Sequence, residues 1–227
     1  MIVAEQKPVE EIRSFLGTYR NIVIASCGTC VTVCLAGGEK EALELKELLA
    51  LADRKEGIGR DYSVVDIKRQ CDAEFIEEKE DCFAGADAIL SLACGVGVQF
   101  MAERFGNIPV LPGLNTKFMG ANRGLGYWTE MCQGCGNCVL EQTGGICPVT
   151  RCSKSNFNGP CGGSQNGKCE VDSEIDCGWQ MIYDRLKRLG QLDRLETIIE
   201  PRDWSTSRDG VPRTVRAYIS DAEKETG

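Results

Sequence analysis

Residues 132–177 have the sequence CQGCGNCVLEQTGGICPVTRCSKSNFNGPCGGSQNGKCEVDSEIDC, which holds eight of the 14 cysteines of the chain. The eight are Cys132, Cys135, Cys138, Cys147, Cys152, Cys161, Cys169 and Cys177. The apolar residues between them are too few and too scattered to offset the backbone entropy that is lost when such a segment becomes ordered. A group bound to the thiols, either a metal or a set of disulfides, must therefore hold the segment together.

The first three of these cysteines follow the pattern C-x-x-C-x-x-C, which favours an iron-sulfur centre. This spacing brings three sulfurs onto one tight loop, where they can bind three corners of a four-iron cluster. The pair Cys147-Pro148 is similar to the cysteine before proline of bacterial ferredoxins, although it lies further along the chain. Eight thiolates suffice for two [4Fe-4S] clusters, and the spacing leaves their pairing open. Zinc and disulfides remain as alternatives.

The composition of the chain excludes several kinds of metal site and of catalysis. The chain has 227 residues, 42 % of them hydrophobic, so it can form one medium domain with a real core and one small domain. It has no histidine, which excludes Cys-His zinc fingers, Rieske centres, histidine-ligated haem and catalysis by Ser-His-Asp or Cys-His. A net charge of −8 argues against nucleic acid as a partner, because phosphate-backbone binding needs an excess of Lys and Arg.

The start of the chain predicts a cytoplasmic protein. Residues 1–16 contain Glu5, Glu10 and Glu11 and lack the basic and apolar blocks of a secretory signal, and no stretch is long enough to span a membrane. A reducing compartment favours metal ligands or redox groups over structural disulfides.

Strands and helices alternate through the first half of the chain. Apolar, β-branched runs predict strands at 21–26, 62–67, 87–92 and 108–111, and helical patterns cover 8–19, 31–51, 73–81 and 98–105. This order predicts an α/β domain with a small doubly wound parallel sheet over residues 1–120. A Cys-rich metal-binding or cluster-binding lobe with a helix after Cys177 is expected over 121–200, with a Gly-rich linker or ordered loop at 112–127. An extended tail follows over 201–227.

Four of the other cysteines are predicted to gather at one edge of this sheet, and a fifth, Cys34, is either a further ligand or an apolar packing residue. Cys27 and Cys30 follow the first strand, Cys71 the second and Cys94 the third, and parallel strands present their carboxyl ends at the same edge. Cys34 lies one helical turn after Cys30, so either Cys34 or Cys71 could complete a metal site. A C-x-x-C redox dithiol and plain packing are the alternatives.

These loops lack the features of a nucleotide site. The sequence after the first strand is CGTCVTVC rather than G-x-G-x-x-G, so the chain alone is not expected to bind a nucleotide or a flavin. Cys82 is expected to be a small buried packing residue.

Several strings resemble one known family. NGPCGGSQNGKCEVDSEIDCGWQMIYDRL, GGICPVTRCSKS, SCGTCVTVCLAGGEKE and LACGVGVQ are similar to the MetV-type iron-sulfur subunit of bacterial methylenetetrahydrofolate reductase, as found in acetogens. The resemblance extends over nearly the whole chain. It implies an accessory, non-catalytic subunit with iron-sulfur centres that partners the flavin-containing MetF-type subunit, which binds the folate and performs the reduction. It places the chain in one-carbon metabolism, in the methyl branch of the Wood-Ljungdahl pathway.

The residues themselves agree with a role in electron transfer. The chain has thiols in two separate places and no evident acid-base pair, so hydride transfer and folate binding are not assigned to it. It is expected to relay electrons to or from the catalytic subunit through two [4Fe-4S] clusters in the lobe. A third metal centre in the first domain is left open. Further electron-transfer subunits are also left open as partners. A zinc-structured scaffold and a C-x-x-C thiol oxidoreductase using Cys27 and Cys30 are the alternative functions.

Overall fold

The computed structural model describes residues 1–198, 200–207 and 212–215. Its internal contacts divide the chain into two units, Met1–Met131 and Cys132–Gly227. The division lies at the end of strand β7 (Tyr127–Cys132), directly before the cysteine-rich segment. None of the helices in the described ranges is long and apolar enough to span a lipid bilayer.

The first unit contains a parallel sheet with the strand order β3-β2-β4-β5. The strands are β2 (Asn21–Cys27), β3 (Asp61–Ile67), β4 (Ala88–Ser91) and β5 (Val110–Pro112). All of their pairings are parallel, and Cys27 pairs with Ile67 while Ala25 pairs with Ser91. The chain leaves β2 toward β3 on one side and later adds β4 on the other, so the order reverses between β2 and β4. In such sheets ligands bind at this reversal.

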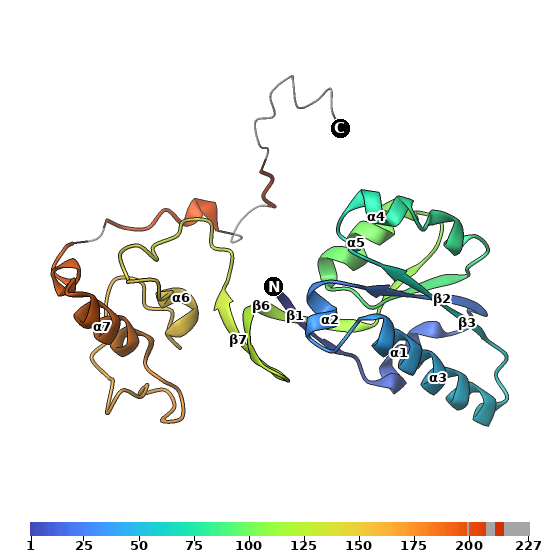
Figure 1. The fold of residues 1–227 in the computed structure, drawn as a ribbon, viewed down its shortest axis with the longest axis horizontal. Coiled ribbons are helices and arrows are strands. Elements are labelled where there is room, and N and C mark those ends of the chain that lie inside the picture. The colour runs from blue at the N-terminus through green and yellow to red at the C-terminus, as the bar shows by residue number, and fades with distance from the viewer. Residues whose placement is uncertain (199, 208–211, 216–227) are drawn as a thin grey trace, which may run out of the picture. The chain divides into compact units, whose positions relative to one another are not determined.

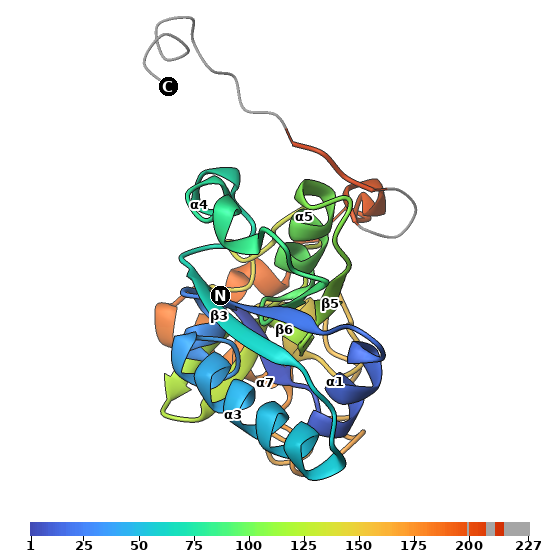
Figure 2. The same ribbon diagram turned by 90° about the vertical axis from the view of Figure 1, so that its right-hand side faces the viewer.

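Helices cover both faces of the parallel sheet, as Figures 1 and 2 show. They are α1 (Val9–Leu16), α2 (Cys30–Val33), α3 (Glu39–Glu56), α4 (Ala73–Glu77), the 3₁₀ helix η1 (Glu80–Phe83) and α5 (Gly95–Arg104). On one face Leu45 and Leu49 of α3 pack with Ile24 of β2. On the other face Met101 of α5 packs with Ile89 of β4. The prediction of a doubly wound α/β domain is confirmed.

Two helix predictions were wrong in their bounds. The helix expected over 31–51 is interrupted at residues 34–38, because Leu35 has a φ of 55° and Gly37 lies against Leu92. A Cβ on Gly37 would lie 2.0 Å from the carbonyl oxygen of Leu92. The helix expected over 73–81 ends at Glu77, and the following 3₁₀ turn buries Phe83 and exposes Cys82. The prediction that Cys82 is a buried packing residue was therefore also wrong.

A second, antiparallel sheet replaces the linker expected over 112–127. Its order is β1-β6-β7, with β1 (Ile2–Gln6), β6 (Leu114–Gly124) and β7 (Tyr127–Cys132). The Gly- and Asn-rich sequence forms a hairpin here, because Gly124 at the end of β6 and Gly126 in the turn before β7 have φ values of 154° and 76°. The glycines that indicated a loop thus form the turn of a hairpin.

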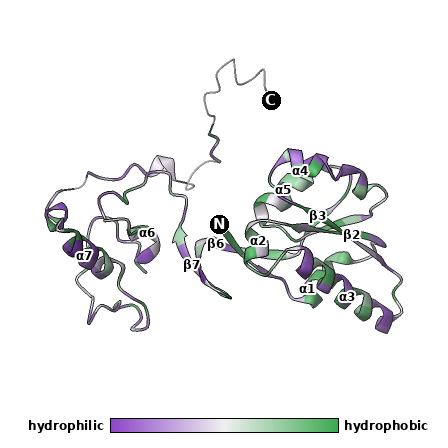
Figure 3. Cartoon of the chain, in the orientation of Figure 1, coloured by the Kyte–Doolittle hydropathy of each residue, from purple (hydrophilic) through white to green (hydrophobic). Residues whose placement is uncertain are grey.

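The second unit has little regular structure and a small core. Its helices are α6 (Pro148–Arg151), α7 (Gly178–Leu189), η2 (Leu192–Leu195) and η3 (Trp204–Thr206). The main core cluster is Trp179, Ile182 and Leu186 of α7, which also carries hydrophilic residues on its other side (Figure 3). Within residues 132–177, all of which the structure describes, only Thr143, Pro148 and Val149 are buried. The cysteine-rich segment therefore has almost no apolar core of its own.

Candidate metal centres

All 14 cysteines are free thiols. In the second unit none of the eight is buried: Cys132, Cys138 and Cys161 are exposed, and the other five are partly buried. In the first unit Cys27 and Cys34 are buried, Cys30 and Cys94 are partly buried, and Cys71 is exposed. The thiols of the second unit are therefore accessible at its surface.

Four of the eight thiols of the second unit line one pocket, which we call the four-thiol pocket. Its cysteines are Cys152, Cys161, Cys169 and Cys177, and its volume is about 250 Å³. They come from four different positions along 26 residues of chain, so only the fold brings them together. The spacing of the sequence left this pairing open, and the pocket groups these four apart from the C-x-x-C-x-x-C cysteines.

A close approach of two helices builds one wall of the four-thiol pocket. Cys152 follows the end of α6 and Cys177 directly precedes α7, and both pack against the core of α7. The first residue of α7 is Gly178, and a Cβ there would lie 2.5 Å from the carbonyl oxygen of Arg151. Only glycine lets the start of α7 lie this close to the end of α6, so the residue after Cys177 fixes where two of the thiols meet.

Backbone hydrogen bonds build the opposite wall. The amide of Cys169 donates to the Ile175 carbonyl at 2.9 Å, and the amide of Cys177 donates to the Gly167 carbonyl at 2.8 Å. Lys168 forms isolated β-bridges with Gln165 and with Asp176. These contacts fold residues 165–177 into a compact loop, which holds Cys169 next to Cys177.

The environment of Cys169 favours its thiolate. A hydrogen bond from the Val171 backbone is the largest cause that lowers the pKa of this thiol, followed by the Ser153 hydroxyl. The Lys154 ammonium lowers the pKa of Cys169 slightly and also forms an ion pair with Glu170. The Cys161 thiol lies 3.6 Å from the same Glu170 carboxylate and donates to it. Since the thiolate is the form that binds a metal, N–H and O–H donors around Cys169 suit it as a ligand.

Residues 132–138, which we call the triplet loop, carry the C-x-x-C-x-x-C cysteines. Gly134 and Gly136 have φ values of 63° and 86°, so the backbone turns tightly after Cys132 and again after Cys135. The amide of Gly134 donates to the Cys132 sulfur at 3.3 Å. Such N–H···S bonds stabilise negative charge on a sulfur ligand.

Cys147 precedes α6 and does not line the four-thiol pocket. Three of the eight thiols belong to the triplet loop and four line the four-thiol pocket, so Cys147 is the one thiol in neither group. The structure therefore groups Cys152, Cys161, Cys169 and Cys177 in one pocket and leaves Cys147 outside it.

In the first unit the expected edge of the parallel sheet brings three thiols together. Cys27 ends β2, Cys94 immediately precedes α5, and Cys71 lies in the loop after β3. Desolvation is the largest cause that raises the pKa of Cys71, although the residue as a whole is exposed, and the Cys27 and Cys94 thiols raise it further. We call Cys27, Cys71 and Cys94 the rim thiols.

Cys34 contacts strand β1. Its thiol donates to the carbonyl oxygen of Ile2 in β1 at 3.4 Å, and burial raises its pKa. The sequence left Cys34 and Cys71 as equal candidates for the site at the sheet edge. The interaction of Cys71 with Cys27 and Cys94 favours Cys71, whereas Cys30, at the start of α2 and partly buried, interacts with Cys34.

Gln70, which sequence reasoning missed, fixes the loop that carries Cys71. Its side chain is fully buried, and its Nε2 donates to the carbonyl oxygens of Ala25 at 2.9 Å and Ser26 at 2.8 Å. Its Oε1 accepts a hydrogen bond from the Ser91 hydroxyl at 2.6 Å. One side chain thus joins the carboxyl ends of β2 and β4 to the loop after β3. A lone glutamine in the polar string KRQCD carries no sequence signal for this role.

Replacing Gln70 by leucine is expected to destabilise the first unit by about 3 kcal/mol, because the Ser26 carbonyl and the Ser91 hydroxyl would lose buried partners. Urea unfolding of the full chain, followed by a probe of the first unit, measures this loss. The matched control is Gln99→Leu, since Gln99 is exposed and makes one local hydrogen bond to Gly95. Equal losses in the two variants would contradict the role given to Gln70.

The described residues contain no group of three or more His, Cys, Asp or Glu side chains that could hold a single metal ion. A zinc ion with Zn–S bonds of about 2.3 Å would draw four sulfurs to within about 4 Å of one another. A four-iron cluster is bulkier and keeps its thiolates further apart around itself. The four-thiol pocket, with a volume of about 250 Å³, has room for a group larger than a single ion.

The fold and these thiols define the class of the protein: an α/β domain with three thiols at a sheet edge, followed by a cysteine-rich unit with little core. Residues 111–205 match a family model described as "Methylene-tetrahydrofolate reductase C terminal". The match begins in β5, ends in η3 and includes all eight cysteines of the second unit. Comparisons with curated proteins and with solved structures gave no match. The chain thus carries a domain that links it to methylenetetrahydrofolate reductase.

Proposed function

We propose that the chain is the accessory iron-sulfur subunit of a methylenetetrahydrofolate reductase. In this role it relays electrons to or from a flavin-containing catalytic MetF-type subunit, in the methyl branch of one-carbon metabolism, within the cytoplasm. The observation that carries the proposal is the family match over residues 111–205, because it covers the cysteine-rich unit and names this reductase. The four-thiol pocket supports it, since that pocket is suited to a bulky thiolate-bound group.

We further propose how the cysteines of the second unit are divided. Cys152, Cys161, Cys169 and Cys177 would hold one [4Fe-4S] cluster, and Cys132, Cys135, Cys138 and Cys147 would hold the other. A cluster of this kind supplies one-electron transfer when bound. The chain's own residues then fix the ligands, provide N–H donors to the sulfurs and join two centres in one small unit.

The rim thiols are proposed as a third metal site, with Cys30 as the fourth ligand. The support is topological and local: the thiols lie where the strand order reverses, and Gln70 ties the loop of Cys71 to both neighbouring strands. Cys94→Ser should lower the metal content of the full chain by one site. Cys34→Ser is the matched control and should not. If both variants keep the full metal content, the rim is not a metal site.

The relay is tested by electron transfer to the partner. The anaerobically reduced chain is mixed with the oxidised flavin-containing subunit, and the flavin absorbance is followed. Flavin reduction that requires the chain, and that slows in Cys135→Ser and in Cys169→Ser, is the expected result. A colourless, zinc-containing chain that binds the partner but leaves its flavin oxidised would favour the zinc-structured scaffold instead.

A further inference from the structure

The described part of the C-terminal segment lies against the triplet loop. Arg202 Nη2 donates to the Cys135 carbonyl oxygen at 2.9 Å, and the Thr206 hydroxyl donates to the same oxygen at 3.2 Å. Arg213 Nη1 donates to the neighbouring Gly134 carbonyl at 2.6 Å. The approach is close, because a Cβ on Gly136 would lie 2.2 Å from the Thr206 carbonyl oxygen. Arg202, Thr206 and Arg213 therefore hold the loop that carries three of the proposed ligands.

Arg202 is buried to an unusual degree for a charged side chain. Only 9 % of it is exposed, and its guanidinium carbon lies 5.1 Å from the centre of the Phe157 ring and 4.6 Å from that of Trp204. Its Nε and Nη1 atoms are buried and have no hydrogen-bond partner among the described residues. A buried guanidinium with two unused donors is costly unless a negative group lies nearby.

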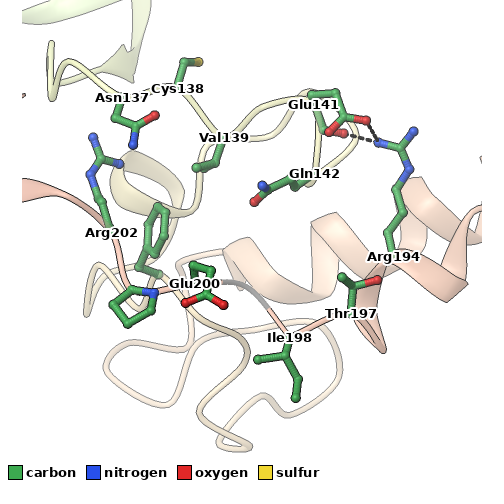
Figure 4. Close-up of a pocket in the computed structure, with 12 residues that line it drawn as sticks. Asn137, Cys138, Val139, Glu141, Gln142, Arg194, Thr197, Ile198, Glu200 and Arg202 are labelled. Carbon is green, nitrogen blue, oxygen red and sulfur yellow. Dashed lines mark hydrogen bonds and ion pairs between the residues drawn. The ribbon is translucent and has the colours of Figure 1, made fainter.

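The charge of Arg202 has no ion-pair partner in the described part of the chain. Within the described ranges neither Arg202 nor Arg213 forms an ion pair with an acid, whereas Arg194 does so with Glu141. Arg202, Asn137 and Cys138 line one pocket of about 560 Å³. In Figure 4 Arg202 and Asn137 lie on one side of this pocket and the Arg194–Glu141 pair on the other. Glu200 also lines the pocket, without an ion pair to Arg202.

We propose that Arg202, with Arg213, sets the charge environment of the centre bound by Cys132, Cys135 and Cys138 and raises its reduction potential. This inference rests on the proposed function. A cluster with four thiolate ligands carries net negative charge and gains one more when it accepts an electron, so nearby positive charge stabilises the reduced form. Arg202 and Arg213 are positioning residues, which act through the Cys135 and Gly134 carbonyls and through their charge.

The test is a redox titration of the full chain, followed by the electron paramagnetic resonance signal of the reduced clusters under anaerobic conditions. The variants are Arg202→Gln, Arg202→Lys and Arg213→Gln. Arg188→Gln is the matched control, because Arg188 is exposed on α7 in the same unit and its loss removes the same charge. Loss of the signal in Cys135→Ser identifies which cluster is being followed.

Arg202→Gln is expected to lower the equilibrium constant for one-electron reduction of that cluster about tenfold, which corresponds to 59 mV. The reduction potential of Arg202→Lys should lie close to that of the wild type, because the charge is retained. The reduction potential of Arg188→Gln should equal that of the wild type. Arg213 is exposed, so Arg213→Gln tests the charge without disturbing the buried guanidinium, and it should lower the constant by a smaller factor. Potentials equal to wild type in Arg202→Gln and Arg213→Gln, with full iron content, would overturn the inference and leave the proposed function intact. Absence of iron from the wild type would overturn both.

Discussion

Removing the proposed metal from the full chain is expected to expose residues 132–207 to rapid proteolysis while residues 1–131 stay resistant. The two units have different sources of stability. The first buries apolar residues on both faces of its parallel sheet. In the second unit, by contrast, only Thr143, Pro148 and Val149 are buried within residues 132–177. Metal binding would then supply the free energy of folding for this segment.

Typical free energies of burial and of backbone ordering support a large effect of metal removal on the second unit. Burying an aliphatic or aromatic side chain contributes about 1.5–3 kcal/mol, and ordering the backbone costs about 1–2 kcal/mol per residue. The core cluster of α7 contains Trp179, Ile182 and Leu186, which cannot order the long loops before it. Without metal, cleavage by trypsin at Lys154 and Lys168 is expected to accelerate at least about tenfold, because cleavage follows the population of the open form.

The measurement is limited trypsin digestion before and after chelation, with mass spectrometry of the fragments. The internal control is the first unit of the same chain, which contains lysines and arginines of its own. A second unit that remains resistant with no metal bound would show that the loops fold without a ligand. Equal loss of resistance in both units would instead indicate global unfolding.

Cysteine replacements should remove the two proposed clusters separately. Cys135→Ser is expected to lower the iron content by about four per chain, since each cluster holds four irons. Cys169→Ser is expected to lower it by about four as well, through loss of the other cluster. The reason is the grouping in the fold: Cys169 lines the four-thiol pocket, and Cys135 lies in the triplet loop. The double variant should lose about eight.

Cys82→Ser is the matched control for these variants. Cys82 is an exposed thiol of the first unit, outside the rim thiols and the second unit. Its replacement should leave iron and sulfide unchanged. Loss of all iron in either single variant would show that the centres are interdependent, and equal losses in Cys82→Ser would refute the assignment of ligands.

The strands of the parallel sheet and the edge that gathers the rim thiols could be predicted from the sequence. The run NIVIAS gave β2 because β-branched apolar residues of strand length are typical of buried parallel strands. The position of Cys27 and Cys94 at one edge then followed from topology alone. What decides between Cys34 and Cys71 is the contact of Cys34 with β1. That strand was not predicted.

The four-thiol pocket depends on contacts between residues far apart in the sequence. Its wall requires the Arg151 carbonyl to lie against Gly178, and a single glycine after a cysteine does not indicate such an approach. The two rings around Arg202 come from Phe157, in the loop after α6, and from Trp204 of η3. Periodicity describes neighbours along one helix or strand, so it gives no information on these pairs.

The central claim is tested most directly by anaerobic analysis of iron, sulfide and zinc in the purified full chain, together with its absorption spectrum. The account predicts a brown protein with at least about eight irons and eight sulfides per chain, from two [4Fe-4S] clusters in the second unit. Any metal at the rim thiols would add to this number. A colourless protein that contains zinc and no sulfide, or no metal at all, would contradict the account.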